Sequence, residues 1–239
     1  MKNLKKLMLG MLFIPVMAMG QTSKTDYTMV QLSRMKCKVG KNMEFEAAVK
    51  KHDAKYHTGK YAAVLWSIET GSQAGDYVWA MGPLTYTDMD KAPGAGEHAK
   101  DWKDTVEPFV QEYGAVEYWK MDADLSFRDD KSQKRQTVWL IDLERGDYYK
   151  FAEFMKKVVV VNKKMGDEVS TWVNQYGEDD GRDVAIVFTF ETFAELDIED
   201  WKMKDEYNKA HGEGTWDNAL DDWNEFTKSI KRSIWSRVE

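Results

Sequence analysis

The sequence has one cysteine, Cys37, in 239 residues, so an internal disulfide is excluded. Phosphate-binding glycine loops and the G-x-S-x-G elbow of serine hydrolases are also missing. Cys37 has only Lys36 and Lys38 as cationic neighbours in sequence, and we expect it to pack as a small apolar residue. These absences argue against a disulfide scaffold, a nucleotide-binding protein and a serine hydrolase.

Histidine is scarce too, with four residues at positions 52, 57, 98 and 211. On a continuous helix the five-residue step from His52 to His57 would place the two side chains about 140° apart. His98 and His211 fall in or beside expected loops of different parts of the chain, and no ligand spacing links them. The sequence therefore predicts no metal site, no haem ligand with a recognisable context, and no cofactor.

Long apolar runs are limited to the N-terminus, MKNLKKLMLGMLFIPVMAMG. A basic start precedes the apolar stretch Leu7 to Met19, and Ala18 and Gly20 occupy the −3 and −1 positions of a cut before Gln21. This pattern is typical of a secretory signal peptide at residues 1–20. The stretch is shorter than the roughly 20 apolar residues that span a bilayer. We therefore expect an exported protein, periplasmic or secreted, without stable membrane insertion after cleavage.

Positive charge is in deficit. The formal net charge is −7, and it becomes −10 once the three lysines of the signal peptide are removed. An acidic surface with scattered lysines is poorly suited to phosphate backbones, so nucleic acid is not an expected partner. A small-molecule ligand, and either a monomer or a homodimer, are compatible with this composition.

What the chain does contain is an internal repeat. Gly146 lies 106 residues after Gly40 (146 − 40). The same offset relates Phe45 to Phe151, Trp66 to Trp172, Gly71 to Gly177 and Gly75 to Gly181. A tandem duplication explains matches that share one register. We expect a first repeat at 26–127, a polar linker at 128–135 and a second repeat at 136–239, with a 14-residue insertion around 198–214.

Each repeat has the same expected order of elements, because stretches of alternating apolar residues flank helical spacings such as Phe45, Val49 and His52. In the first copy we expect strands at 27–38, 61–69, 76–87 and 115–127, with helices at 43–56 and about 102–110. In the second copy we expect strands at 137–143, 168–176, 183–193 and 235–238, with helices at 147–161 and 217–233.

The order βαββαβ, with two helices on one face of a four-stranded antiparallel sheet, is the ferredoxin-like arrangement of the α+β class. The other sheet face would expose large apolar side chains such as Trp79 and Trp119 to water. We therefore expect the two repeats to pack sheet to sheet as an intrachain α/β barrel.

At this point the chain resembles the dimeric α/β-barrel superfamily, which includes antibiotic-biosynthesis monooxygenase-like and NIPSNAP-like proteins, as a tandem fusion. The resemblance covers about Asp26 to Glu239 and rests on element order, the opening VWLIDLERGDYYKFAEFM, and the WNEF helix followed by SIWSRV. It implies a cavity between sheet and helices, and chemistries from cofactor-free oxygenation to haem binding. No catalytic residue follows from it.

His52 is the most informative polar residue. It lies on the apolar face of its expected helix, whereas the matching position of the second copy is Val158. Two interpretations remain open: a hydrogen-bonded core histidine, or a general base or ligand contact in a cavity. His57 aligns with Lys163 and is expected to be solvated.

Aromatic residues of the first copy offer a possible ligand-binding wall, namely Trp66, Trp79, Tyr118 and Trp119. The alternative is that these side chains are simply core. The main functional hypothesis is a barrel cavity that binds a small, largely apolar molecule, with cofactor-independent oxygenase-like chemistry as an extension. The alternatives are an interaction or structural protein with a filled barrel, and a haem-binding protein. Whether the protein is an enzyme is left open.

Overall fold

The computed structural model describes residues 27–128, 134–177, 181–197 and 202–239. The expected signal peptide, the middle of the linker and the start of the 198–214 insertion lie outside these ranges. Among the described residues, no helix combines the length and apolar character needed to cross a bilayer.

The first repeat follows the predicted order closely. Its elements are β1 (Met29–Cys37), α1 (Asn42–Tyr56), the 3₁₀ turn η1 (Gly59–Tyr61), β2 (Ala63–Ile68), β3 (Asp76–Leu84), the short α2 (Tyr86–Met89), α3 (Glu97–Thr105), η2 (Glu107–Phe109) and β4 (Val110–Phe127). The second helix ends before Pro108, which lacks the amide hydrogen that a continuing helix needs. β4 therefore begins at Val110, five residues before the predicted start.

The second repeat comprises β5 (Arg135–Leu143), α4 (Tyr148–Met165), β6 (Val169–Asn174), β7 (Val184–Phe190), η3 (Phe193–Asp197), α5 (Met203–His211), α6 (Thr215–Phe226) and β8 (Thr227–Arg237). The predicted helix at 217–233 and strand at 235–238 were wrong at their boundary. α6 ends at Phe226, and β8 pairs with β5 from Leu143↔Thr227 to Arg135↔Ser236. The stretch TKSIKRSIW fits a helix or a strand by local pattern, and the pairing with β5 decides it.

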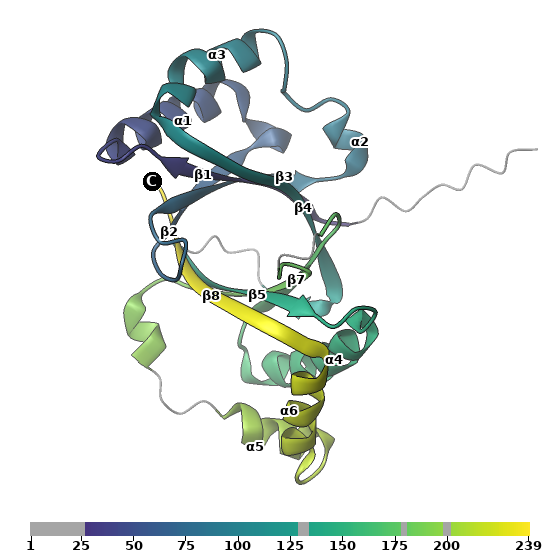
Figure 1. Cartoon of the computed structure of the whole chain (residues 1–239). Coiled ribbons are helices and arrows are strands. Elements are labelled where there is room, and N and C mark those ends of the chain that lie inside the picture. Colours follow the sequence, from purple (N-terminus) through teal and green to yellow (C-terminus); the bar gives the residue numbers. More distant parts are fainter. Residues whose placement is uncertain (1–26, 129–133, 178–180, 198–201) are drawn as a thin grey trace, which may run out of the picture.

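The eight strands form one closed barrel in the order β1-β3-β2-β8-β5-β7-β6-β4. Each repeat contributes four adjacent strands, and the repeats meet edge to edge at two seams, β2·β8 and β4·β6. The predicted intrachain barrel is confirmed, and its closure comes from paired edge strands, which leaves no free sheet edge. Helices α1 and α3 cover one outer side of the barrel, and α4 and α6 cover the opposite side (Figure 1).

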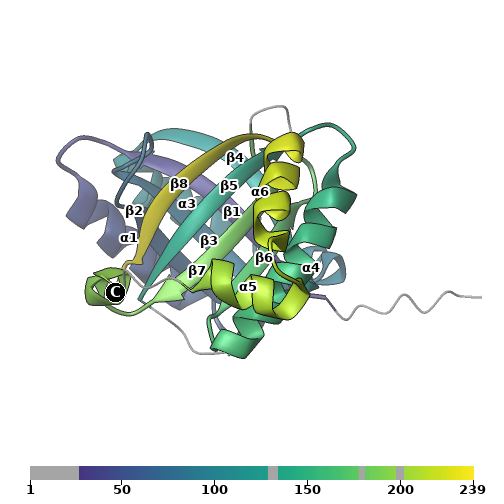
Figure 2. The same cartoon turned by 90° about the horizontal axis from the view of Figure 1, so that it is seen from below.

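Part of the insertion folds as α5, which packs beside α4 and α6 on the outside of the second repeat (Figure 2). Its buried contacts are apolar: Val161 of α4 meets Met203 and Tyr207 of α5 and Trp216 of α6. In the described part of the insertion these side chains extend the core of the second repeat.

Apolar side chains fill three layers. One lies between α1, α3 and the strands of the first repeat, and a second lies between α4, α6 and the strands of the second. The third contains Ile68, Val78, Val138 and Trp235, which come from strands of both repeats and from no helix. These residues therefore meet inside the barrel, where the partly buried Trp66 packs against them.

We expect a chain cleaved between the repeats to stay assembled. A protease site placed at 129–133 would cut the connection but leave the β2·β8 and β4·β6 pairings in place. The cleaved halves should co-elute in gel filtration and unfold in one transition. Two separately soluble, folded halves would contradict closure through these seams.

Candidate functional site

The four aromatic residues singled out from the sequence do not share one cavity. Trp66 packs inside the barrel, and Trp119 also faces the interior because it pairs with Val30 on the same face as Leu32. Trp79 faces α1 on the outer side of the sheet. Tyr118 lies in a chain of tyrosine rings with Tyr86 and Tyr176.

His52 is buried, with 1% of its surface exposed, on the side of α1 that faces α3. Its Nδ1 lies 2.9 Å from Oδ2 of Asp101, and Asp101 also accepts a hydrogen bond of 3.1 Å from Lys55 Nζ. These two partners lower the pKa of Asp101 to about 2. The carboxylate is therefore ionised at neutral pH, and His52 Nδ1 carries the hydrogen that joins them.

Two further histidines meet His52. His52 Nε2 lies 3.2 Å from His98 Nε2, and His57 Nε2 lies 3.0 Å from the same atom. His57 was expected to be solvated, and the structure corrects this, since His57 is 6% exposed. His98, expected in or beside a loop, is in the first turn of α3, directly after the loop that precedes this helix.

The predicted 140° separation of His52 and His57 was wrong because it assumed one continuous helix. α1 ends at Tyr56, and His57 caps it with φ −112° and ψ 66°, outside the helical region. The chain turns at this residue and directs the His57 ring back toward His52. Their ring centroids are 5.4 Å apart.

Burial disfavours the charged form of both His57 and His98. The pKa of His57 is lowered to about 4, first by burial and then by the neighbouring His98 and His52. Burial and His52 also lower the pKa of His98. Neutral imidazole has a free nitrogen lone pair, the form in which histidine binds metal ions.

Aromatic rings enclose the three histidines. Trp79 lies edge-on to His57 with centroids 4.8 Å apart, and Trp102 lies edge-on to His52 at 4.9 Å. The Trp79 indole N–H donates to both oxygens of Asp53, at 3.1 and 3.2 Å. Burial raises the pKa of Asp53 to about 6, although the Trp79 hydrogen bond acts in the opposite direction.

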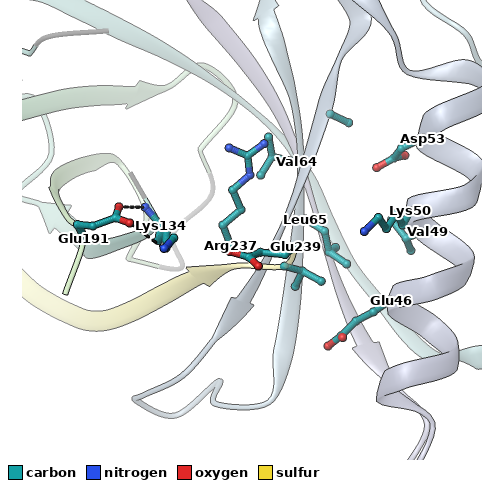
Figure 3. A pocket seen from close by; sticks show the side chains of 12 residues that line it. Glu46, Val49, Lys50, Asp53, Val64, Leu65, Lys134, Glu191, Arg237 and Glu239 are labelled. Carbon is teal, nitrogen blue, oxygen red and sulfur yellow. Dashed lines mark hydrogen bonds and ion pairs between the residues drawn. The ribbon is translucent and has the colours of Figure 1, made fainter. Parts of the chain in front are cut away.

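Asp53 also borders a cleft of about 560 Å³ between α1, the start of β2 and the C-terminal residues. Val49 and Lys50 of α1 and Leu65 of β2 lie on one side of β2, and Val64 lies on the other side beside Arg237 (Figure 3). Across β2 the cleft is bordered by charged side chains: Lys134, Glu191, Arg237 and Glu239. The Asp53–Trp79–His57 contacts connect this cleft to the histidine cluster.

Comparison with known proteins identifies the fold. No protein-family model and no curated protein sequence match the chain. Solved structures do match over almost the whole chain, and they have the dimeric α/β-barrel fold that the sequence resembles. The chain therefore has this fold, with both halves of the barrel in one polypeptide.

Three of these structures show how similar the matching proteins are in sequence and in structure. A protein of Lactobacillus acidophilus NCFM, named for a proposed monooxygenase activity, is 13% identical, with 89% of this chain and 94% of that chain covered and a TM-score of 0.56. An anthrone oxidase-like protein is 7% identical, with 90% and 92% covered and a TM-score of 0.53. Chlorite dismutase from Candidatus Nitrospira defluvii is 9% identical, with 87% and 91% covered and a TM-score of 0.52.

Proposed function

We propose that the protein binds a small organic molecule in the cleft between α1, β2 and the C-terminus, in a binding or oxygenase-like role. The observation that carries this proposal is the cleft itself. Its volume of about 560 Å³ falls within the roughly 300–1,000 Å³ of ordinary ligand sites. The fold neighbours named for monooxygenase and anthrone oxidase-like proteins support the same class.

The composition of the cleft indicates an amphipathic ligand. Val49, Ala63 and Leu65 give it an apolar wall, and Lys50 and Arg237 stand at the border. A flat or elongated apolar body with an anionic group would contact both parts. Asp53, held by Trp79, can accept a hydrogen bond from a donor on such a molecule.

The cleft replaces the interior of the barrel as the place where a ligand would bind. Trp235 and Trp66 occupy the interior near the β2·β8 seam, together with aliphatic side chains of β1, β2, β3, β5 and β7. An ion pair of 2.7 Å between Arg182 and Glu117 adds polar contacts beside Trp119. This packing also favours the second candidate, a non-enzymatic interaction or structural protein with a filled barrel.

Haem fits the chain poorly, although one fold neighbour is a haem-binding protein from Thermus thermophilus, with 9% identity, 89% and 92% coverage and a TM-score of 0.50. Between sheet and helices, the second repeat is filled by side chains such as Phe151 and Phe226. His211 Nε2 contacts the carbonyl of Lys157, and the rings of His57, His98 and Trp102 pack around His52. Among the described residues, no histidine lines any of the three best-formed clefts.

The cleft can be tested with 8-anilinonaphthalene-1-sulfonate, a fluorescent probe with an apolar body and one anionic group. We expect saturable binding of one equivalent, and a roughly three- to tenfold loss of affinity in Lys50→Glu because the charge at the border is reversed. Lys156→Glu is the matched control, since Lys156 is exposed at the same position of the second copy. Equal binding by both variants would contradict the cleft as the site.

A further inference from the structure

We propose that His52, His57 and His98 form a binding site for a divalent transition-metal ion, with zinc as the best match. One ring nitrogen of each residue lies within 4.8 Å of those of the other two. The residues come from the last two turns of α1, its C-cap and the first turn of α3. The packing of α1 against α3 therefore creates the site, which goes beyond the small-molecule cleft.

The distances suit a metal ion. Zinc binds histidine nitrogen at about 2.0–2.1 Å, so two nitrogens of a tetrahedral site are roughly 3.3 Å apart. The His52–His98 and His57–His98 contacts are 3.2 and 3.0 Å, close to that separation. The remaining pair needs the larger adjustment. It falls on the side chain of His57, which lies beyond the last helical residue, although its backbone N–H still donates to the carbonyl of Asp53.

Hydrogen bonding alone does not explain the cluster. His98 Nε2 has one in-plane position, which holds either a hydrogen or a lone pair. It can therefore form one two-centre hydrogen bond, yet two Nε2 atoms lie within 3.2 Å of it. A cation among the three nitrogens would accept all three lone pairs at once and remove this conflict.

The opposite nitrogens add to the argument. Among the described residues, the Nδ1 atoms of His57 and His98 are buried without a hydrogen-bond partner. The polar contacts of these two rings are therefore concentrated at Nε2. In buried histidine rings both nitrogens normally have a hydrogen-bond partner. An ion bound at Nε2 would offset part of the free energy lost by burying Nδ1 without one.

Asp101 completes a familiar arrangement. Metal-binding histidines usually donate their second ring nitrogen to a carboxylate, which fixes the tautomer and makes the ligand more basic. The 2.9 Å contact between His52 Nδ1 and Asp101 Oδ2 has this geometry and leaves the Nε2 lone pair directed at the cluster. Asp101 is therefore a positioning residue, itself held by Lys55.

Three imidazoles favour zinc, copper, nickel or cobalt over calcium or magnesium, which prefer oxygen ligands. Three protein ligands also leave one zinc position for water or another small ligand, as in catalytic zinc sites. His98 is half-buried, whereas His52 and His57 are buried, so His98 is the member of the cluster nearest to solvent. The second copy has Val158 and Lys163 at the positions that match His52 and His57, and its described residues contain no equivalent histidine cluster.

The test uses full-length protein made without a histidine tag and freed of metal by chelation. Calorimetric titration with zinc chloride should show one equivalent bound, and cobalt(II) should give the visible absorption of a four-coordinate nitrogen site. His98→Gln and His57→Gln keep the side-chain size and should weaken zinc binding by at least about 100-fold. Asp101→Asn should weaken it by about 10–100-fold.

His211→Ala is the matched control, because His211 lies outside the cluster and contacts the Lys157 carbonyl. Its zinc affinity should equal that of the unmodified protein. Circular dichroism of each variant checks that it is folded. Binding of less than one equivalent, or one-equivalent binding that survives both glutamine substitutions, would overturn the proposal. Unchanged zinc binding in Lys50→Glu would separate this site from the cleft.

Discussion

Replacing Trp235 by alanine is expected to lower the free energy of unfolding by about 3–5 kcal/mol. Trp235 is 7% exposed and packs inside the barrel against Ile68, Val78 and Val138. It also pairs with Ile68 across the β2·β8 seam that joins the two repeats. The substitution therefore removes a large interior side chain at the point where the repeats are connected.

Urea unfolding followed by circular dichroism would measure this loss. Tyr149→Ala is the control, since Tyr149 is 59% exposed and its removal should change stability by less than about 0.5 kcal/mol. A loss below about 1 kcal/mol for Trp235→Ala would mean that the interior is loosely packed. That result would restore the barrel interior as a candidate ligand cavity.

The fold could be predicted because its signals are local and repeated. The 106-residue offset, together with the helical spacing of Phe45 and Val49, indicates two copies of one βαββαβ unit. What could not be predicted was where α6 gives way to β8. Ile230 and Ile234 fit the apolar face of a helix, but they also fit a strand, and only the pairing of Ile230 with Ile141 fixes the choice.

The histidine cluster was only partly predictable. His52 stood out because its counterpart is Val158, but its partners Asp101 and His98 are 49 and 46 residues away in sequence. Those contacts depend on the packing of α1 against α3, which local periodicity does not specify. One signal was present: three of the four histidines fall in the first copy, between residues 52 and 98.

His57 shows a different limit. Its place in the cluster depends on α1 ending at Tyr56, and helix ends are the least predictable part of a sequence assignment. One further helical residue would have directed the ring elsewhere. A single backbone residue therefore separates the predicted solvated side chain from the buried one.

His52→Val should lower the free energy of unfolding in metal-free protein, and the difference from the unmodified protein should be larger when zinc is bound. In metal-free protein we expect a loss of about 1–3 kcal/mol, because Asp101 and His98 each lose a buried hydrogen-bond partner. The smaller end of this range is expected because Lys55 still contacts Asp101. Valine itself suits the position, as the half-buried Val158 shows in the second copy.

With zinc at 100 times its Kd, the unmodified protein should gain about 2.7 kcal/mol, since a ligand that binds only the folded state stabilises it. His52→Val should gain almost nothing, so the gap between the two proteins should widen by that amount. Urea unfolding without zinc measures the loss of stability, and unfolding with zinc measures the stabilisation by the metal. Lys50→Ala, on the exposed side of the same helix, is the control. If His52→Val matched the unmodified protein under both conditions, His52 would be only a spacer in the core. A loss well above 3 kcal/mol without metal would instead mean that its hydrogen bonds hold the first repeat together.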